Sequence, residues 1–353
     1  MKRMAEYQRL DEVCHINMGQ SPDSKSYNQE GVGLPFFQGN ADFGAVHPET
    51  RVWCSSPTKI VEAGTLLISV RAPIGALNFA KERSCIGRGL AGITPQNGVS
   101  LKYIYYCLKG KNKELNAKGT GSTFKAIAKS ALGEISVKIV SEEDQLKIIQ
   151  TLDRVSSVIE ARKQQLTELD NLIKARFVEL FYDKGYPVLK WNDVFNTTTG
   201  KLDSNAAVDS GEYPFFTCSK EVLKIDKYAF EQEALLLAGN NAAGKYDVKY
   251  YNGKFNAYQR TYVLGLKEDW SYRLFQYQLE DKLVYLQQQS LGGLTKYLTL
   301  KILGELEFII PPKDKQEEFE LFVKQTDKSK VVVQKALDEA QTLFDSLMQE
   351  YFG

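Results

Sequence analysis

The chain has 353 residues, of which 43% are hydrophobic, and its 45 basic and 44 acidic side chains leave a net charge of +1. This length exceeds what one hydrophobic core usually organises, so two modules of roughly 170 residues are expected. No apolar run approaches the roughly 20 residues of a membrane helix, and the first residues lack the apolar segment of a signal peptide. We therefore expect a cytoplasmic protein.

Cysteine and histidine usage limits the possible chemistry. The cysteines lie far apart without a Cys-x-x-Cys pair, which predicts reduced thiols: Cys14, Cys54, Cys85, Cys107 and Cys218. Both histidines, His15 and His47, lie in the first half of the chain. A zinc site or a histidine-based triad present in both halves is therefore excluded.

Residues 1–140 predict a basic α+β module, with 18 Lys and Arg against 11 Asp and Glu. GTLLISVRAPIGALNFA has the composition of a buried strand interrupted by a turn, and ISVKIV alternates like a half-buried strand. LKYIYYCLKG predicts a short helix with Ile104 and Leu108 one turn apart. The positive surplus favours a polyanion, but residues 190–312 hold 14 basic against 15 acidic side chains, so charge alone does not identify a DNA-binding protein.

From Ser141 the hydrophobic period becomes that of a long helix. Apolar residues recur in alternating steps of four and three, with Arg162 and Arg176 in two remaining slots: Ile148, Leu152, Val155, Ile159, Leu166, Leu169, Ile173 and Leu180. Ser141 followed by three acidic residues predicts the start of the helix, and Gly185 and Pro187 predict its end. Some 40 residues would make a rod of roughly 60 Å.

Residues 189–310 return to short strands and turns, and Pro311-Pro312 then opens a second long helix. Its apolar stripe is less regular because Thr326 and Lys330 take seam positions: Phe319, Val323, Val333, Leu337, Phe344 and Leu347. Packing of each helix on its own domain is one possibility. Pairing of the two helices would bury both stripes at once, and we predict antiparallel pairing with the modules at opposite ends.

The two halves of the sequence repeat each other. ALGEISVKIVSEEDQ begins at Ala131 and returns as ILGELEFIIPPKDKQ at Ile302, 171 positions later. The same spacing relates Gly121 to Gly292, Lys125 to Lys296, Leu132 to Leu303, Gly133 to Gly304, Glu134 to Glu305 and Gln145 to Gln316. LPFFQG resembles YPFFTC at a spacing of 179, so loops between the copies differ in length. A repeat this long indicates a duplicated domain.

Common catalytic motifs are missing from the sequence. It has no GxxxxGK[ST], GxGxxG, HExxH or G-x-S-x-G, and no Asn/Asp-Pro-Pro-aromatic tetrapeptide of the kind that amino-methyltransferases use. We therefore predict that the chain is not an enzyme; the rival, a nuclease or methyltransferase, has no motif in its favour. Two related modules on a rigid spacer suit duplex DNA, whose half-sites on one face lie about 34 Å apart or at multiples of this distance.

These segments resemble the specificity subunit of type I restriction–modification systems over nearly the whole chain. The resemblance rests on GTGSTFKAIAKSALGEISVKIV running into SEEDQLKIIQTLDRVSSVIEARKQQLTELD, and on the second copy GGLTKYLTLKILGELEFIIPPKDKQEEFE. GTLLISVRAPIG, IGRGLAGI, LLLAGNNAAG and FNAYQR also match the family's recognition domains. The chain departs from the family pattern at Val140-Ser141, where a Pro-rich turn is usual, and at LTKYLT, which is less typical than STFKAI.

The resemblance implies an α+β fold with a pseudo-two-fold internal repeat. Two similar target recognition domains would be separated by two long antiparallel helices forming a coiled coil. The segments would be target recognition domain 1 at 1–140, the central conserved long helix at 141–185, target recognition domain 2 at 186–312 and the C-terminal conserved long helix at 313–353.

The resemblance also implies a function in DNA recognition. Each domain would read one half of a bipartite site in double-stranded DNA. The helix pair would set the spacer and dock two methyltransferase subunits, which restriction/translocase subunits would join. S-adenosylmethionine, Mg²⁺ and ATP would belong to these partners, with no cofactor in this chain. The alternative is a coiled-coil scaffold that assembles proteins without binding DNA.

Candidate DNA contacts follow from residue type, because Lys, Arg and small polar groups bind phosphates while a few side chains read base edges. In the first module they are Arg71, Arg88, Lys118, Ser122, Thr123 and Lys125, and in the second Asn240, Asn241, Lys245, Gln259, Arg260, Lys296 and Tyr297. Asn and Gln suit adenine and Arg suits guanine; a solvated charge or a turn residue is the open alternative at each position. The pairs Phe36-Phe37 and Phe215-Phe216 are expected in the core.

Overall fold

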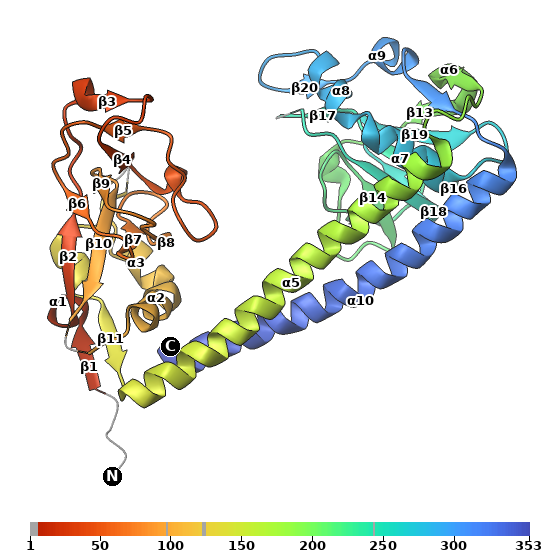
Figure 1. Cartoon of the computed structure of the whole chain (residues 1–353). Coiled ribbons are helices and arrows are strands. Elements are labelled where there is room, and N and C mark those ends of the chain that lie inside the picture. Colours follow the sequence, from red (N-terminus) through yellow and green to blue (C-terminus); the bar gives the residue numbers. More distant parts are fainter. Residues whose placement is uncertain (1–5, 97, 122–124, 243) are drawn as a thin grey trace. The chain divides into compact units, whose positions relative to one another are not determined.

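The computed structural model describes residues 6–96, 98–121, 125–242 and 244–353 (Figure 1). The chain divides into two compact units. Unit 1 comprises residues 1–163 and 335–353, and unit 2 comprises residues 164–334. Each unit therefore contains one α+β module and one half of each of two long helices.

The module of unit 1 is built on two sheets. Its strands are β1 (Glu6–Arg9), β2 (Cys14–Met18), β3 (Tyr27–Asn28), β4 (Leu34–Phe37), β5 (Trp53–Cys54), β6 (Ile60–Val61), β7 (Leu66–Ser69), β8 (Leu77–Phe79), β9 (Ser84–Ile86), β10 (Leu90–Pro95) and β11 (Ser136–Ile139). Its helices are α1 (Leu10–Val13), α2 (Leu101–Gly110), α3 (Asn112–Ala117) and α4 (Lys129–Gly133), with 3-10 turns at Ser24–Ser26 and Asn40–Asp42. One sheet has the order β2-β10-β7-β8 and the other β3-β5-β4-β9-β6, while β1 pairs with β11.

The module of unit 2 is built on one larger sheet. Its strands are β12 (Val188–Lys190), β13 (Phe195–Thr199), β14 (Tyr213–Phe216), β15 (Leu223–Ile225), β16 (Phe230–Ala238), β17 (Asn240–Asn241), β18 (Val248–Ala257), β19 (Thr261–Leu266), β20 (Lys296–Tyr297) and β21 (Glu307–Ile309). Its helices are α6 (Trp191–Val194), α7 (Tyr272–Asp281), α8 (Leu283–Gln289) and α9 (Leu300–Gly304), with a 3-10 turn at Ser204–Ala206. The large sheet has the order β13-β19-β16-β18-β14-β15, and β12 pairs with β21 as β1 does with β11.

Local predictions from hydrophobic pattern are confirmed in both modules. LKYIYYCLKG forms α2, and Ile104 and Leu108 are fully buried on its inner face. The four phenylalanines of the two Phe-Phe pairs are all buried, as expected of core residues: Phe36, Phe37, Phe215 and Phe216. One-turn spacing identified the core positions of the helix, whereas the adjacent phenylalanines were expected in the core from their residue type.

The two long helices are α5 (Glu142–Phe181) and α10 (Lys313–Phe352). The hydroxyl of Ser141 accepts the Asp144 backbone N–H at 3.1 Å, so the predicted cap is present at the start of α5. The helix ends at Phe181, before the predicted stop at Gly185. Asp183 and Gly185 both have positive φ, of 55° and 67°, which a right-handed helix cannot continue through.

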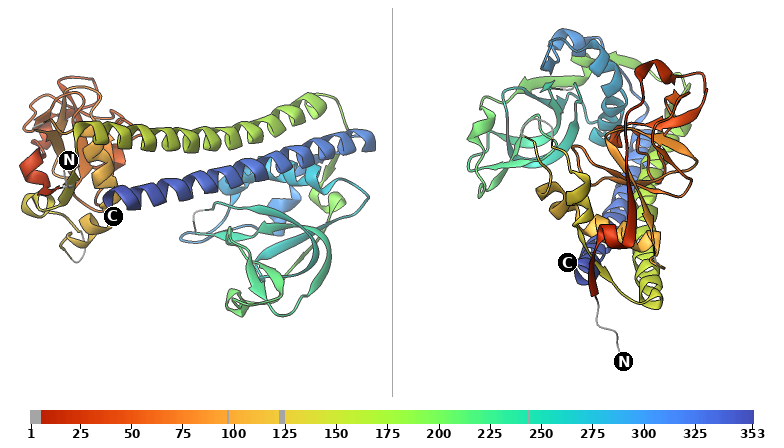
Figure 2. Two further views of the ribbon diagram at one scale, coloured as in Figure 1. Left: turned by 90° about the horizontal axis from the view of Figure 1, so that it is seen from below. Right: turned by 90° about the vertical axis from the view of Figure 1, so that its left-hand side faces the viewer.

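The long helices pair antiparallel within each unit. In unit 2, Asp170 of α5 contacts Lys330 of α10, and Arg176 contacts Glu318, so one residue number rises as the other falls. In unit 1, the first half of α5 shares one hydrophobic cluster with the last residues of α10, including Phe344 and Met348. Figures 1 and 2 show the two helices side by side. Every predicted apolar seam position is buried or half-buried.

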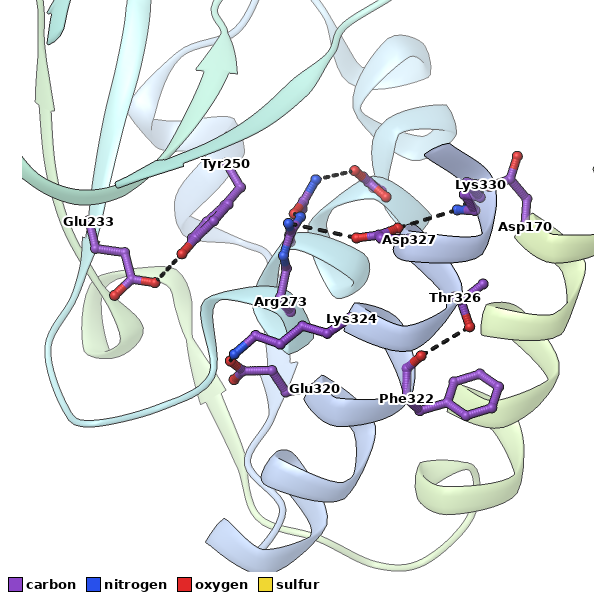
Figure 3. Close-up of polar contacts among 12 residues, drawn as sticks. Asp170, Glu233, Tyr250, Arg273, Glu320, Phe322, Lys324, Thr326, Asp327 and Lys330 are labelled. Atoms are coloured by element: carbon purple, nitrogen blue, oxygen red, sulfur yellow. Dashed lines mark hydrogen bonds and ion pairs between the residues drawn. The ribbon is translucent and has the colours of Figure 1, made fainter. Parts of the chain in front are cut away.

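The polar residues predicted in the seam of α10 have partners in unit 2. The Thr326 hydroxyl donates to the Phe322 carbonyl of its own helix at 3.0 Å. Lys330 reaches Asp170 across the helix pair at 2.6 Å. Figure 3 shows both contacts beside the α7 side chain that joins the module to the helices. Helix α10 therefore keeps polar groups at its seam without leaving them unpaired in the interface.

A chain of polar contacts connects the sheet of unit 2 with its helix pair. The Tyr250 hydroxyl of β18 donates to Glu233 of β16 at 2.6 Å. The Arg273 guanidinium of α7 lies 4.3 Å from the centre of the Tyr250 ring. On its other side Arg273 pairs with Asp327 of α10 at 3.6 Å (Figure 3). The orientation of this sheet is thus coupled to α10 through one arginine.

Unit 1 makes the corresponding connection with different residues. Asp153 of α5 pairs with Lys102 of α2 at 2.7 Å. The same carboxylate accepts the Tyr106 hydroxyl at 2.6 Å. Lys102 and Tyr106 lie 171 positions before Arg273 and Tyr277 of α7. The two copies therefore conserve the place of the connection and change its side chains.

A buried glutamine in the first turn of each long helix is repeated in both sequence and geometry. Gln145 accepts the Ser100 backbone N–H at 2.9 Å and donates to the Val140 carbonyl at 3.1 Å. Gln316 accepts the Ser271 N–H at 2.9 Å and donates to the Pro311 carbonyl at 2.9 Å. Both glutamine side chains therefore hold the residue before α2 or α7 against the first turn of α5 or α10.

The predicted fold class is confirmed: an α+β chain with two related modules and two long helices that pair antiparallel. None of the helices in the described residues is long and apolar enough to cross a membrane. The boundaries of the recognition domains at 1–140 and 186–312 stay a prediction, because the compact units each include parts of the long helices.

The glutamine contact predicts a specific loss of stability. Gln145→Ala leaves the Ser100 N–H and the Val140 carbonyl buried without their partner. This should lower the free energy of unfolding by about 1–3 kcal/mol, measured by urea denaturation of the full chain. Gln150→Ala, at an exposed position of the same helix, serves as the control. Equal effects of the two substitutions would contradict this assignment.

Candidate nucleic-acid interface

In unit 1, loops from several strands meet at the end of β7 where the chain leaves the sheet. The Gly19 N–H donates to the Leu90 carbonyl at 2.9 Å, and the Gly87 N–H donates to the Phe37 carbonyl at 2.8 Å. A Cβ atom on Gly19 would lie 2.2 Å from the Gly87 oxygen. Glycine is required here because the two backbones touch.

Three side chains occupy one cross-strand row at these loops, and a fourth lies in the adjoining turn. Strand β10 pairs Leu90 with Ser69 of β7, and the Val70 N–H then donates to the Gly89 carbonyl at 2.9 Å. Arg71 follows Val70, and Arg88 precedes Gly89 in the turn that leads into β10. Residues opposite each other in a ladder project from the same face.

The row continues beyond β7 into the loop that follows α3. Arg71 forms an isolated antiparallel β-bridge with Ala126, and Ala126 forms another with Thr120. Arg71, Ala126 and Thr120 therefore form one cross-strand row, and Arg88 lies in the turn next to its Arg71 end; we call these four residues row 1. Val70 and Ile127 alternate with this row and are buried, so row 1 lies on the opposite, outer face.

The same row exists in unit 2 at repeat-related positions. Strand β16 pairs Ala238 with Thr261 of β19, and the Gly239 N–H donates to the Arg260 carbonyl at 2.8 Å. Asn240 follows Gly239, and Gln259 precedes Arg260 in the turn that leads into β19. Asn240 pairs with Tyr297, and Tyr297 bridges Leu291. Row 2 therefore consists of Gln259, Asn240, Tyr297 and Leu291.

The two rows are equivalent in position and different in chemistry. Three of the four pairs keep the spacing of 171, namely Arg88 with Gln259, Ala126 with Tyr297 and Thr120 with Leu291. Arg71 and Asn240 are 169 apart, so the second copy has two more residues between this pair and the pair Arg88 and Gln259. The backbone hydrogen bonds that define the rows are the same in both units, so the duplicated scaffold presents two different sets of side chains.

The structure brings together five of the predicted contact residues in the rows: Arg71, Arg88, Asn240, Gln259 and Tyr297. Lys125 and Lys296 each precede a row member, and Asn241 pairs with Lys296 across β17 and β20. Arg260 is the neighbour of Gln259, and the Lys245 N–H donates to the Asn241 side chain at 3.3 Å. Ser122 and Thr123 lie outside the described residues.

Lys118 is placed differently from the other predicted cations. Its ammonium lies 3.7 Å from the Glu134 carboxylate. A phosphate ligand would compete with this ion pair.

Three row members, Thr120, Ala126 and Leu291, were not predicted from sequence. The spacing of 171 between Thr120 and Leu291 could have indicated equivalent positions, but neither residue type is typical of a DNA contact.

Three of the predicted cations of unit 1 are available to an external ligand. Arg71, Arg88 and Lys125 are exposed and form no ion pair with any residue that the structure describes. Burial raises the pKa of Tyr27, and the positive charge of Arg88 partly opposes this shift. Three neighbouring unpaired positive charges favour an anionic ligand such as a nucleic-acid backbone.

The cysteines fit a structural role. Cys14, Cys54, Cys85 and Cys107 are buried and Cys218 is half-buried, and all five are free thiols. Burial raises the pKa of Cys14 to about 12, which keeps its thiol protonated and unreactive at neutral pH. Within the described ranges, no group of three His, Cys, Asp or Glu side chains is arranged to hold a metal ion.

A family model matches the chain twice. The family described as the type I restriction modification DNA specificity domain covers residues 4–171 and again residues 184–339. The chain belongs to this family. The two matches coincide with the internal repeat, and each includes one of the two cross-strand rows.

Individual relatives match shorter segments. The chain is 39% identical over 160 residues to a Methanocaldococcus jannaschii protein assigned as the MjaX type I restriction enzyme specificity subunit, covering 45% of this chain and 38% of that protein. It is 35% identical over 134 residues to the EcoDI type I restriction enzyme specificity subunit of Escherichia coli, covering 37% and 29%. The chain thus spans less than half the length of either relative.

A solved structure matches along the whole chain. The S subunit of a type I restriction-modification system from M. genitalium has a TM-score of 0.64, with 99% of this chain and 96% of that chain covered. Sequence identity is 17%, so this likeness concerns the fold. The arrangement of two modules and two long helices is therefore one that a family member adopts in a crystal structure.

The close approach of backbones at Gly19 gives a test of the loop geometry. Gly19→Ala should force the loops of residues 19 and 87 apart and destabilise the full chain by about 1–3 kcal/mol. Gly39→Ala is the matched control, because no atom lies within 4 Å of a Cβ placed there. Thermal unfolding of both variants checks the expectation, and an unchanged melting temperature for Gly19→Ala would refute the geometry.

Proposed function

We propose that this chain is the DNA-binding specificity subunit of a type I restriction–modification complex. The observation that carries the proposal is the duplicated cross-strand row, which places different polar and basic side chains on one repeated scaffold. Each module then reads one half of a bipartite site in double-stranded DNA. Family membership supports this reading of the repeat.

The paired helices have a separate role in the proposal. They set the spacer between the two half-sites and dock two methyltransferase subunits, which restriction/translocase subunits join. Two 40-residue helices suit this role because each is long and continuous. The free thiols and the DNA substrate suit a protein of the cytoplasm.

Catalysis is assigned to the partners. S-adenosylmethionine, Mg²⁺ and ATP would bind to the methyltransferase and restriction subunits, and this chain would determine the DNA sequence at which those subunits act. Its contribution to affinity comes from Lys and Arg on phosphates, and its contribution to specificity comes from the rows.

Phosphate binding by the two repeated lysines is tested by salt dependence. Lys125→Ala and Lys296→Ala, each in complex with the methyltransferase partner, should weaken binding by a similar factor on every duplex sequence. Each should also reduce the slope of log affinity against log salt by about 1. Fluorescence anisotropy at several salt concentrations measures both quantities.

The control is Lys81→Ala. Lys81 is an exposed cation that follows β8, at the end of β7 opposite to Arg71, and its loss should leave the salt slope unchanged. A complex that assembles with the methyltransferase but binds no duplex above background would favour the scaffold function instead.

A further inference from the structure

The equivalence of the two rows allows a comparison that neither module allows alone. At the first two positions of each row, row 1 carries Arg88 and Arg71, while row 2 carries Gln259 and Asn240. The neighbouring lysines, Lys125 and Lys296, are the same in both copies. A scaffold duplicated to read two different sequences must vary where it contacts bases and can stay constant where it contacts phosphates.

We infer that positions 71 and 88 read guanine in one half-site, and that positions 240 and 259 read adenine in the other. This inference rests on the proposed function and specifies the chemistry of its two reading surfaces. The pairing of side chain and base follows from donor and acceptor geometry. Arg donates two hydrogen bonds to guanine O6 and N7, and Asn or Gln both accepts from and donates to adenine N6 and N7.

The arginines of row 1 are free to make such contacts. Both side chains are exposed, and neither forms an ion pair with a described residue. The Arg88 backbone N–H is held by the Ser21 hydroxyl at 3.4 Å, and the Ala72 N–H beside Arg71 donates to the Lys125 carbonyl at 3.0 Å. The backbone at both positions is therefore fixed while the guanidinium groups can turn toward a ligand.

The amides of row 2 are similarly placed. Asn240 is half-buried, and no hydrogen bond of its side chain is found among the described residues. The Gln259 side chain donates to Asp203 at 3.4 Å, a long contact at an exposed site that a base edge can replace. The Gln259 backbone N–H donates to the Leu202 carbonyl at 2.9 Å. Asn240 thus lies in a ladder and Gln259 in the adjoining turn, and the backbone at both positions is already hydrogen-bonded.

The other two positions of each row add apolar contacts of different size. Row 1 has Ala126 and Thr120, and row 2 has Tyr297 and Leu291. Tyr297 and Leu291 are 40% and 47% exposed and form a β-bridge with each other, so they offer adjoining apolar surface to a ligand. The methyl group of thymine is the apolar feature of the major groove. An adenine-reading row with exposed apolar neighbours therefore suits a half-site rich in A·T pairs.

The dimensions of a row fit the groove of duplex DNA. Neighbouring strands lie about 4.8 Å apart, so four residues in a cross-strand row span roughly 14 Å. The major groove is about 12 Å wide, and bases follow each other every 3.4 Å along a strand. One row can thus reach about three or four successive base pairs.

The test is a selection of randomised duplexes by the full chain in complex with its methyltransferase partner, followed by affinity measurements on the selected sites. The wild type should select a split motif with guanine at fixed positions in one half and adenine in the other. Arg71→Ala with Arg88→Ala should weaken binding to the selected site on the order of 10- to 100-fold and erase the guanine preference. Asn240→Ala with Gln259→Ala should erase the adenine preference alone.

Substituted duplexes separate base reading from phosphate binding. On a site whose guanines are already replaced, the arginine double variant should bind within about 2-fold of the wild type, because the lost contact was base-specific. The half-site of the untouched module should stay selected in each variant, which also shows that the protein is folded. Lys81 follows β8 near the start of β7, and Asn252 of β18 lies opposite Glu233 of β16. Both residues are exposed and far from the rows, so Lys81→Ala and Asn252→Ala should change neither half of the motif.

Two results would overturn the inference. A uniform loss of affinity on all duplexes would assign the rows to phosphates, and an unchanged motif in both double variants would place base reading elsewhere in the modules. A wild-type complex that selects no motif would instead count against the proposed function as a whole, so the two failures are distinguishable.

Discussion

The buried glutamine at the start of each long helix is the contact on which the rest of the architecture depends. Gln145 and Gln316 each link the residue before a module helix to the strand-end carbonyl that precedes a long helix. Each side chain uses both ends of its amide, so any rotation of the module on the helix would break two buried hydrogen bonds. These hydrogen bonds therefore help to fix the orientation of the module within its unit, together with the ion pairs of α2 and α7 with the long helices.

The duplication separates constant from variable features within one chain. Backbone hydrogen bonds, the glutamine contacts and the paired lysines are the same in both copies. The row side chains differ, as do the polar contacts on the helices, where Lys102 and Asp153 in unit 1 correspond in role to Arg273 and Asp327 in unit 2. A protein that reads two sequences with one fold needs this division, because the scaffold must stay rigid while the reading residues change.

Sequence alone predicted what local periodicity encodes. The seam of α5 and the inner face of α2 follow from spacings of three or four residues, and the buried Phe-Phe pairs follow from residue type; the structure confirms all three. The rows could not be derived in this way. The β7–β10 ladder ends beside the segments that hold Arg71 and Arg88, and Arg71 forms a β-bridge with Ala126 across a loop, so the rows depend on tertiary register.

Residue type also limited the sequence-based account of the interface. Arg, Lys, Asn and Gln draw attention as DNA contacts, whereas Thr120, Ala126 and Leu291 do not, although the ladder places them in the rows. Lys118 was predicted on residue type and forms an ion pair with Glu134.

The most direct measurement is methylome sequencing of a clean host that expresses this chain with its methyltransferase subunit, before and after each module is exchanged for that of a relative. The account predicts a split methylated motif in which one half changes with each exchange. A motif that changes in both halves at once, or no methylation from a stably assembled complex, would contradict it.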